Sequence, residues 1–120
     1  MNNPNTTHRV LREVLAERAR QDERWGEQNH PDGTGPTIEL LPGWPARELA
    51  DAARATCQLH ADQGILTYRD VFGEEVCEAL AENDPAKLRA ELVQAVAVGV
   101  LWIEAIDRRR TQARAEEVPQ

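Results

Sequence analysis

Apolar residues recur every three or four positions in four stretches of this chain, which is the spacing of amphipathic helices. The pattern predicts helices over residues 7–24, 46–62, 67–82 and 84–107. Together they predict an all-α fold, a bundle of four helices. The residues expected to face its core are Val10, Leu11, Val14, Leu15, Leu49, Ala53, Cys57, Val71, Phe72, Val76, Ala79 and Leu80. The long stem of Arg18 is expected to extend the first stripe, and His60 to line the second helix as a partly buried structural group.

Polar residues mark the boundaries of these helices. Thr67 reads as an N-cap with Asp70 three residues later, a variant of the capping box. Asp84 is expected to cap the fourth helix, with Pro85 in its first turn, where no N–H is missed. Gly64 is the expected stop of the second helix.

The segment 26–45 separates the first two helices and has a different composition. It holds four of the seven glycines and four of the seven prolines, so it cannot continue a helix. Trp25 and Trp44 bracket it. Long loops are uncommon in compact domains and many of them bind ligands. We therefore expect a long Gly/Pro-rich loop with a functional role.

The fourth helix is apolar on most of its faces between residues 92 and 106, where mainly Gln94, Gly99 and Glu104 interrupt the pattern. Such a helix must be buried on most faces, and four short helices can hardly enclose it. The pattern therefore predicts a homodimer or a larger oligomer formed through this helix. We expect one helical domain over residues 7–107, a disordered N-terminus over 1–6 and a flexible charged tail over 108–120.

Length and charge narrow the classes of function. A chain of 120 residues with a formal net charge of −7 fits one domain and argues against generic binding of nucleic acid. Its longest apolar run, residues 95–103, is about half of what a membrane span needs. The short apolar run argues against a partner in the membrane. The two distant cysteines, Cys57 and Cys77, fit a reduced, cytoplasmic protein.

Two pairs of acidic or amide residues carry the candidate chemistry. Glu75-x-x-Glu78 and Glu91-x-x-Gln94 flank a helix break at residues 83–85. Residues three apart share a helix face, so in an antiparallel hairpin the two pairs point at each other. Gln94 interrupts an apolar helix, and a buried amide needs partners. Such oxygen ligands suit Mg²⁺, with Mn²⁺ as the alternative.

The plainer interpretation is that the glutamates form a solvated helix face. A competing acidic pair, Glu104 and Asp107, lies roughly 20 Å further along the fourth helix and cannot share a site with Glu78. We expect that pair to form a polar helix end near Arg108.

The motifs resemble a known family at this point. GEEVCEAL at residues 73–80, followed by LRAELVQ at 88–94, resembles the all-α nucleoside triphosphate pyrophosphohydrolases of MazG type. RQDERWGEQNHP at residues 20–31 is similar to the opening of small phage and actinobacterial MazG-like proteins. The resemblance covers roughly residues 10–106.

The resemblance implies Mg²⁺-dependent cleavage of an NTP or dNTP to the monophosphate and pyrophosphate. By position, Glu75, Glu78 and Glu91 match the family's metal ligands, and Gln94 stands where the family usually has Asp. The loss of one negative charge puts metal affinity in question. A nucleotide-binding protein with weak or no catalysis is therefore the alternative, and a purely structural interaction protein is a third hypothesis.

The remaining candidate residues concern catalysis and substrate binding. Glu74 is a candidate to position or deprotonate the attacking water, although it lies one residue off the metal face. Lys87 and Arg89 are candidates for phosphate oxygens, with surface solvation as the alternative. Trp25 is a candidate to stack on the base or to anchor the loop. His30 either contacts a ligand or belongs to a turn.

Overall fold

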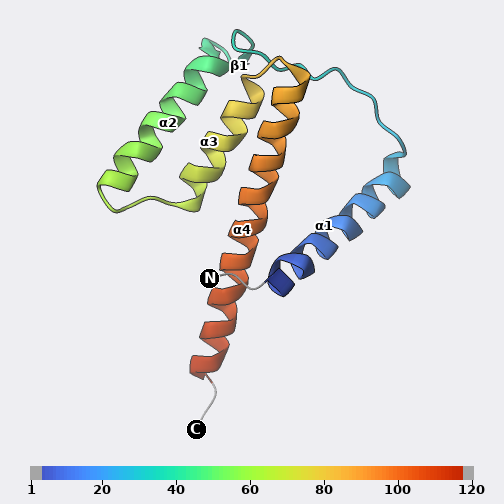
Figure 1. The fold of residues 1–120 in the computed structure, drawn as a ribbon, viewed down its shortest axis with the longest axis vertical. Helices are drawn as coiled ribbons and strands as arrows, with labels where there is room; N and C mark the ends of the chain where they lie inside the picture. Colours follow the sequence, from blue (N-terminus) through green and yellow to red (C-terminus); the bar gives the residue numbers. More distant parts are fainter. Residues whose placement is uncertain (1–3, 118–120) are drawn as a thin grey trace. The chain divides into compact units, whose positions relative to one another are not determined.

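The computed structural model describes residues 4–117, and within them it contains four α-helices and one small hairpin (Figure 1). The elements are α1 Pro4–Trp25, β1 Glu39–Leu41, β2 Trp44–Pro45, α2 Ala46–Asp62, α3 Tyr68–Leu80 and α4 Pro85–Glu117. The predicted all-α fold with four helices is confirmed. No helix within these residues is both long and apolar enough to cross a membrane.

The chain divides into two compact units, where the sequence pattern predicts one domain over residues 7–107. One unit combines the chain up to His30 with the chain from Val100 onward. The other is Pro31–Gly99, and it contains the hairpin, α2, α3 and the first half of α4. The candidate acidic residues all belong to this second unit.

Helix boundaries follow the local signals closely. The second predicted helix, 46–62, coincides with α2. Thr67 and Asp70 form a complete capping box at the start of α3, in which each side chain accepts a hydrogen bond from the other residue's backbone N–H. Asp84 Oδ2 accepts from the backbone N–H of Lys87 at 3.0 Å, and α4 begins at Pro85. These predictions of caps are confirmed.

Both ends of the chain are more helical than their polarity suggests. Residues 4–6 belong to α1 and residues 108–117 to α4, where the sequence pattern predicts a disordered start and a flexible charged tail. Pro4 suits the first position of a helix, and the arginines and alanines of the tail have high helix propensity. Residues 1–3 and 118–120 lie outside the described part of the chain.

The long segment after α1 contains a hairpin that the composition did not predict. Leu41 pairs with Trp44 in antiparallel fashion across Pro42 and Gly43. Gly43 has φ +81°, a value that glycine adopts without strain, and a proline before such a glycine is the signature of a type II turn. The Pro-Gly pair was therefore the signal for this turn.

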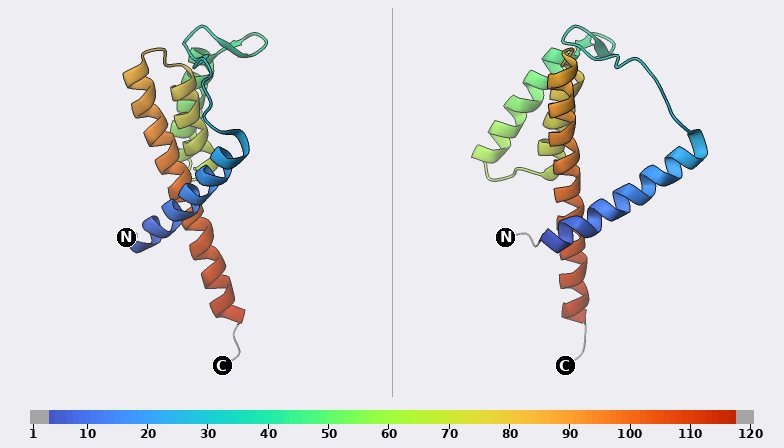
Figure 2. Two further views of the ribbon diagram at one scale, coloured as in Figure 1. Left: turned by 90° about the vertical axis from the view of Figure 1, so that its right-hand side faces the viewer. Right: turned by 45° about the vertical axis from the view of Figure 1, so that its right-hand side comes forward.

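A short capping segment, residues 34–38, satisfies backbone groups at the ends of two helices. At the start of α2, Ala46 N–H donates to the carbonyl of Ile38 (2.8 Å) and Arg47 N–H to that of Pro36 (3.0 Å). At the end of α3, Gly35 N–H donates to the carbonyl of Leu80 at 3.0 Å. Thr34 Oγ1 also donates, to the carbonyl of Glu82 at 2.6 Å. Figure 2 shows the hairpin region beside these two helix ends.

Small residues bring α2 and α3 together. Ala46, Ala50 and Ala81 are buried in one cluster, against which Leu40 and Cys77 pack. Alanine side chains keep the two backbones close, because no larger group separates them. Cys57 is also buried, as the predicted stripe of α2 requires.

The first unit departs from its predicted packing. Of the α1 stripe, Val10 is buried, whereas Leu11 and Leu15 are exposed. Glu104 was expected at a polar helix end, but its side chain is only 3% exposed and accepts a hydrogen bond from Thr7 Oγ1. That expectation is wrong, because Thr7 near the start of α1 supplies a hydroxyl that hydrogen-bonds to the carboxylate.

The capping box of α3 gives the first testable prediction. Thr67→Ala removes the side-chain oxygen that accepts from Asp70 N–H at 3.1 Å. We expect a loss of about 1 kcal/mol in the free energy of unfolding. The melting temperature in circular dichroism should fall by roughly 4 °C. Thr37→Ala, at an exposed loop position, is the control, and an equal fall in both variants would contradict the assignment.

Candidate active site

The acidic candidates lie on α3 and on the first half of α4, which form a helical hairpin closed by residues 81–84. Glu74, Glu75 and Glu78 belong to α3, and Glu91 to α4. The Phe72 side chain of α3 packs on Gly99 of α4, where an added Cβ would lie 3.4 Å from Phe72 Cε1. A larger side chain at position 99 would therefore push against the Phe72 ring of α3.

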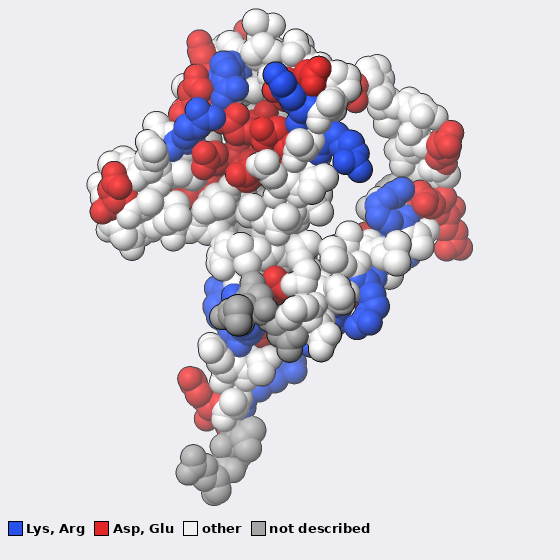
Figure 3. Space-filling model, in the orientation of Figure 1, with Lys and Arg blue, Asp and Glu red and all other residues white. Residues whose placement is uncertain are grey.

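Glu75 is half-buried among other carboxylates. Burial raises the pKa of its carboxyl above the ordinary range, and the charges of Glu91, Glu74 and Glu78 raise it further, in that order. The contribution of Glu91 shows that the charge of this α4 carboxylate reaches the α3 group. Figure 3 shows acidic side chains gathered on this part of the molecule, with basic side chains beside them. Such a field favours a bound cation.

Glu78 is held by two arginines of α2. Arg47 Nη2 lies 3.2 Å from Glu78 Oε1 and 3.1 Å from Oε2. Arg54 also donates to Oε1, and its Nε lies 3.9 Å from Glu74 Oε1. The hydrogen bond to Glu78 is the main reason why the pKa of Arg47 is raised. Sequence reasoning missed both arginines, although their spacing of seven residues on one helix was visible.

Gln94, the fourth candidate ligand, is exposed. The expectation of a buried amide is wrong for this chain alone, because nothing in the second unit covers that side of α4. Among residues 4–117, no group of three His, Cys, Asp or Glu side chains is already arranged to hold a metal ion. The donor chemistry nevertheless fits magnesium, since carboxylate and amide oxygens are its usual protein ligands.

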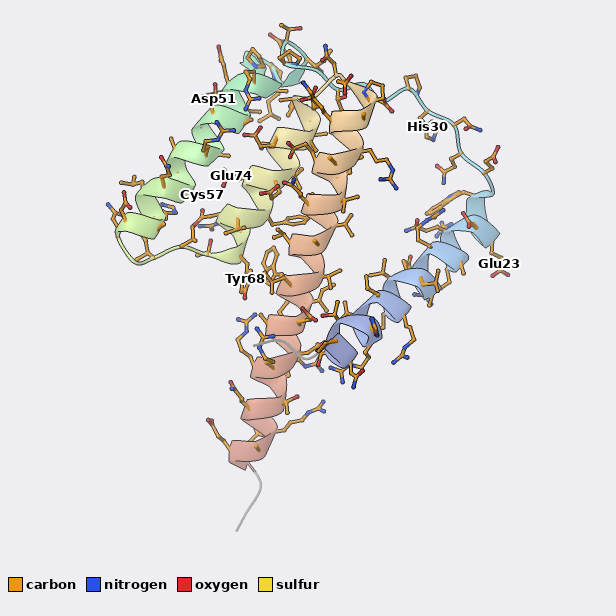
Figure 4. All side chains as sticks on the ribbon, viewed as in Figure 1. Glu23, His30, Asp51, Cys57, Tyr68 and Glu74 are labelled. Atoms are coloured by element: carbon orange, nitrogen blue, oxygen red, sulfur yellow. The ribbon has the colours of Figure 1, made fainter. Side chains whose placement is uncertain are left out.

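A second polar cluster lies beside the acidic residues, between α2 and α3. Figure 4 shows Cys57 and Glu74 on neighbouring parts of these helices. Burial first, and then a hydrogen bond with Glu74, raises the pKa of Cys57 to about 11. The thiol therefore stays protonated at neutral pH, and Sγ donates to the carbonyl of Asp70 at 3.0 Å. This cysteine is a structural donor and not a nucleophile.

His60 completes this cluster and has the structural role that the pattern predicts. Its Nδ1 lies 2.8 Å from Asp70 Oδ2. This contact is the largest cause that holds the pKa of Asp70 below its usual range, and the bonds with Thr67 act in the same direction. The cluster therefore joins the C-terminal part of α2 to the first turn of α3.

The candidate substrate-binding residues fall into both units. Lys87 and Arg89 are exposed on the first turns of α4, in the same unit as the carboxylates. Trp25 and His30 belong to the first unit. Trp25 is exposed, with the Arg24 guanidinium 5.0 Å from its ring centroid, and His30 Nε2 lies 3.2 Å from Gln28 Oε1.

Comparisons with protein-family models, with curated proteins and with solved structures gave no match for this chain.

The crowding of carboxylates around Glu75 predicts a gain of stability on neutralisation. A carboxyl whose pKa is raised by folding contributes stability below its ordinary pKa and loses it as the pH rises through the raised value. At pH 7, without divalent cations, Glu75→Gln should therefore melt at a higher temperature than the wild type. The difference should vanish at a pH below the ordinary range of glutamate.

The measurement is a melting curve by circular dichroism at both pH values, in the presence of a chelator. Glu39→Gln, at an exposed position of β1, is the control and should leave the melting temperature unchanged. A lower melting temperature for Glu75→Gln at pH 7 would show that the carboxylate is stabilising.

Proposed function

We propose that this protein is a Mg²⁺-dependent nucleoside triphosphate pyrophosphohydrolase, which cleaves an NTP or dNTP to the monophosphate and pyrophosphate. The observation that carries the proposal is the half-buried carboxyl of Glu75, surrounded by the charges of Glu91, Glu74 and Glu78 from two antiparallel helices. This arrangement is the one that the resemblance to the MazG-type family implies. Mn²⁺ is the alternative ion.

The residues divide into roles by position. Glu75, Glu78 and Glu91 would hold the metal ion, with the amide oxygen of Gln94 as a fourth ligand. The ion would neutralise phosphate charge and activate water. Glu74 is partly exposed beside this group, where its carboxylate can orient the attacking water and accept its proton.

Two residues of the second unit are proposed to contact the substrate, and two residues of the first unit are candidates for the same role. Lys87 and Arg89 present exposed cationic groups on the first turns of α4, the helix that carries Glu91. Trp25 offers an exposed aromatic face for a base, and His30 an exposed imidazole. Positioning and charge neutralisation are the main requirements for phosphoryl chemistry, and these groups can supply both.

The proposal includes a cytoplasmic homodimer or homotetramer built on α4. Leu92, Val93 and Val96 are 47%, 56% and 55% exposed in the second unit. A second copy would present the same apolar face, so the surfaces are self-complementary.

The oligomer is tested by sedimentation. The wild type should sediment with at least twice the chain mass of 13.5 kDa, and Val96→Glu should shift it toward the single chain. A charge buried in an apolar contact is costly, which is the reason for the expected dissociation. Ala90→Glu, at an exposed position of α4 outside the apolar run, is the control. A wild type that is monomeric at all concentrations would refute the oligomer.

The activity is tested by phosphorus NMR with a panel of NTPs and dNTPs. With Mg²⁺, the wild type should release pyrophosphate and a monophosphate. Glu91→Gln should lose at least about 100-fold in kcat/KM, because it removes one proposed metal ligand. Glu48→Gln, an exposed carboxyl in the first turn of α2, should keep the activity. Equal activity in Glu91→Gln would exclude the proposed site.

A second candidate function is nucleotide binding without cleavage, which the neutral, exposed Gln94 favours. In that case the wild type would bind nucleotide without turnover, and Gln94→Asp would gain hydrolytic activity. The same NMR assay separates the two functions.

A further inference from the structure

Two guanidinium groups converge on one carboxylate at the edge of the candidate site. Arg47 and Arg54 lie seven residues apart on α2 and so share a helix face. Arg47 contacts both oxygens of Glu78, and Arg54 contacts one of them and approaches Glu74. The Glu78 side chain is only 15% exposed, whereas the two arginines are 40% and 55% exposed. The carboxylate is the fixed partner, and the arginines can leave it.

Glu78 cannot keep all of its hydrogen bonds from Arg47 and Arg54 and also ligate a metal ion. A carboxylate has about four lone-pair positions, and three donor contacts from Arg47 and Arg54 already point at its two oxygens. If Glu78 held a divalent cation, the charge of the ion would repel both guanidinium groups and weaken both ion pairs. The N–H groups of the two arginines would then be free to bind another acceptor.

The ligand that suits these groups is a phosphate. Guanidinium binds carboxylate and phosphate through the same planar fork of donors, so the carboxylate of Glu78 stands in for a phosphate group. A polyanion approaching a chain of net charge −7 also needs local positive charge. Arg47 can supply this charge. Its backbone N–H donates to the carbonyl of Pro36, which fixes the backbone at the start of α2.

We propose that Arg47 and Arg54 exchange Glu78 for phosphate oxygens of the substrate's triphosphate when Glu78 becomes a metal ligand. The inference rests on the proposed function and extends it, since it adds a phosphate-binding pair from α2 to Lys87 and Arg89 of α4. Before a metal ion binds, the arginines hold Glu78. After it binds, they hold the phosphate groups of the substrate.

Titration calorimetry with Mg²⁺ alone, and with pyrophosphate in excess Mg²⁺, tests the exchange. Arg47→Gln/Arg54→Gln should bind Mg²⁺ several-fold more tightly than the wild type, because Glu78 has lost its competitors. It should bind pyrophosphate on the order of 100-fold more weakly, because charge-assisted hydrogen bonds are lost. A variant that failed to fold would lose both affinities, whereas the exchange strengthens Mg²⁺ binding and weakens pyrophosphate binding. Arg69→Gln, at an exposed arginine of α3, should change neither affinity.

Replacement by lysine refines the assignment. Arg47→Lys/Arg54→Lys keeps the charge and loses the fork, so its pyrophosphate affinity should lie between those of the wild type and the glutamine variant. If the double glutamine variant does not fold, Arg54→Gln alone carries the test, since Arg54 is the more exposed of the two.

The outcomes distinguish this inference from the proposed function. Unchanged pyrophosphate affinity in the variants, or a wild type that binds no pyrophosphate, overturns the exchange, even where NMR shows hydrolysis by the wild type. Pyrophosphate binding that depends on the arginines, in a wild type that cleaves no nucleotide, supports the exchange and refutes the proposed hydrolase.

Discussion

The second unit depends on hydrogen bonds that residues 34–38 make to the ends of α2 and α3. Helix ends leave backbone groups without intrahelical partners, and leaving such a group buried and unpaired costs about 1–3 kcal/mol. α2 has no side-chain N-cap, so the carbonyls of Pro36 and Ile38 take that place. Because Gly35 reaches the end of α3 within the same segment, one stretch of backbone sets the register of two helices. That register places Arg47 of α2 beside Glu78 of α3, where the two side chains form an ion pair.

Charge in this unit is arranged in opposing layers. α3 presents carboxylates on both of its sides, toward α2 and toward α4. On the α2 side, Arg47 and Arg54 offset them, and the pairs formed are geometrically specific. On the α4 side, Glu91 adds another negative charge, and Glu75 bears the consequence in its raised pKa. The carboxylates of α3 are therefore paired with arginines on its α2 side and lie near a further negative charge on its α4 side.

Sequence reasoning succeeded where the signal is local. The capping box of Thr67 and the start of α4 at Pro85 depend on residues within one helical turn, so spacing alone identifies them. The two helices on either side of residues 83–85 were also predictable, because the break separates two stretches with helical spacing. Arg47 could not be assigned, since its partner lies 31 residues away and meets it only through the packing of α2 on α3. Nor could the burial of Glu104, which needs a hydroxyl from the distant Thr7.

The position of Lys87 has a practical consequence, because it is the only lysine in the chain. Apart from the N-terminal amine, acylating reagents and acetyl donors would find one amine, exposed in the first turn of the helix that carries Glu91. A fluorophore attached there would stand about 6 Å along the helix axis from that carboxylate. A single covalent label would therefore report on the candidate site, and a single acetylation would remove one of its positive charges.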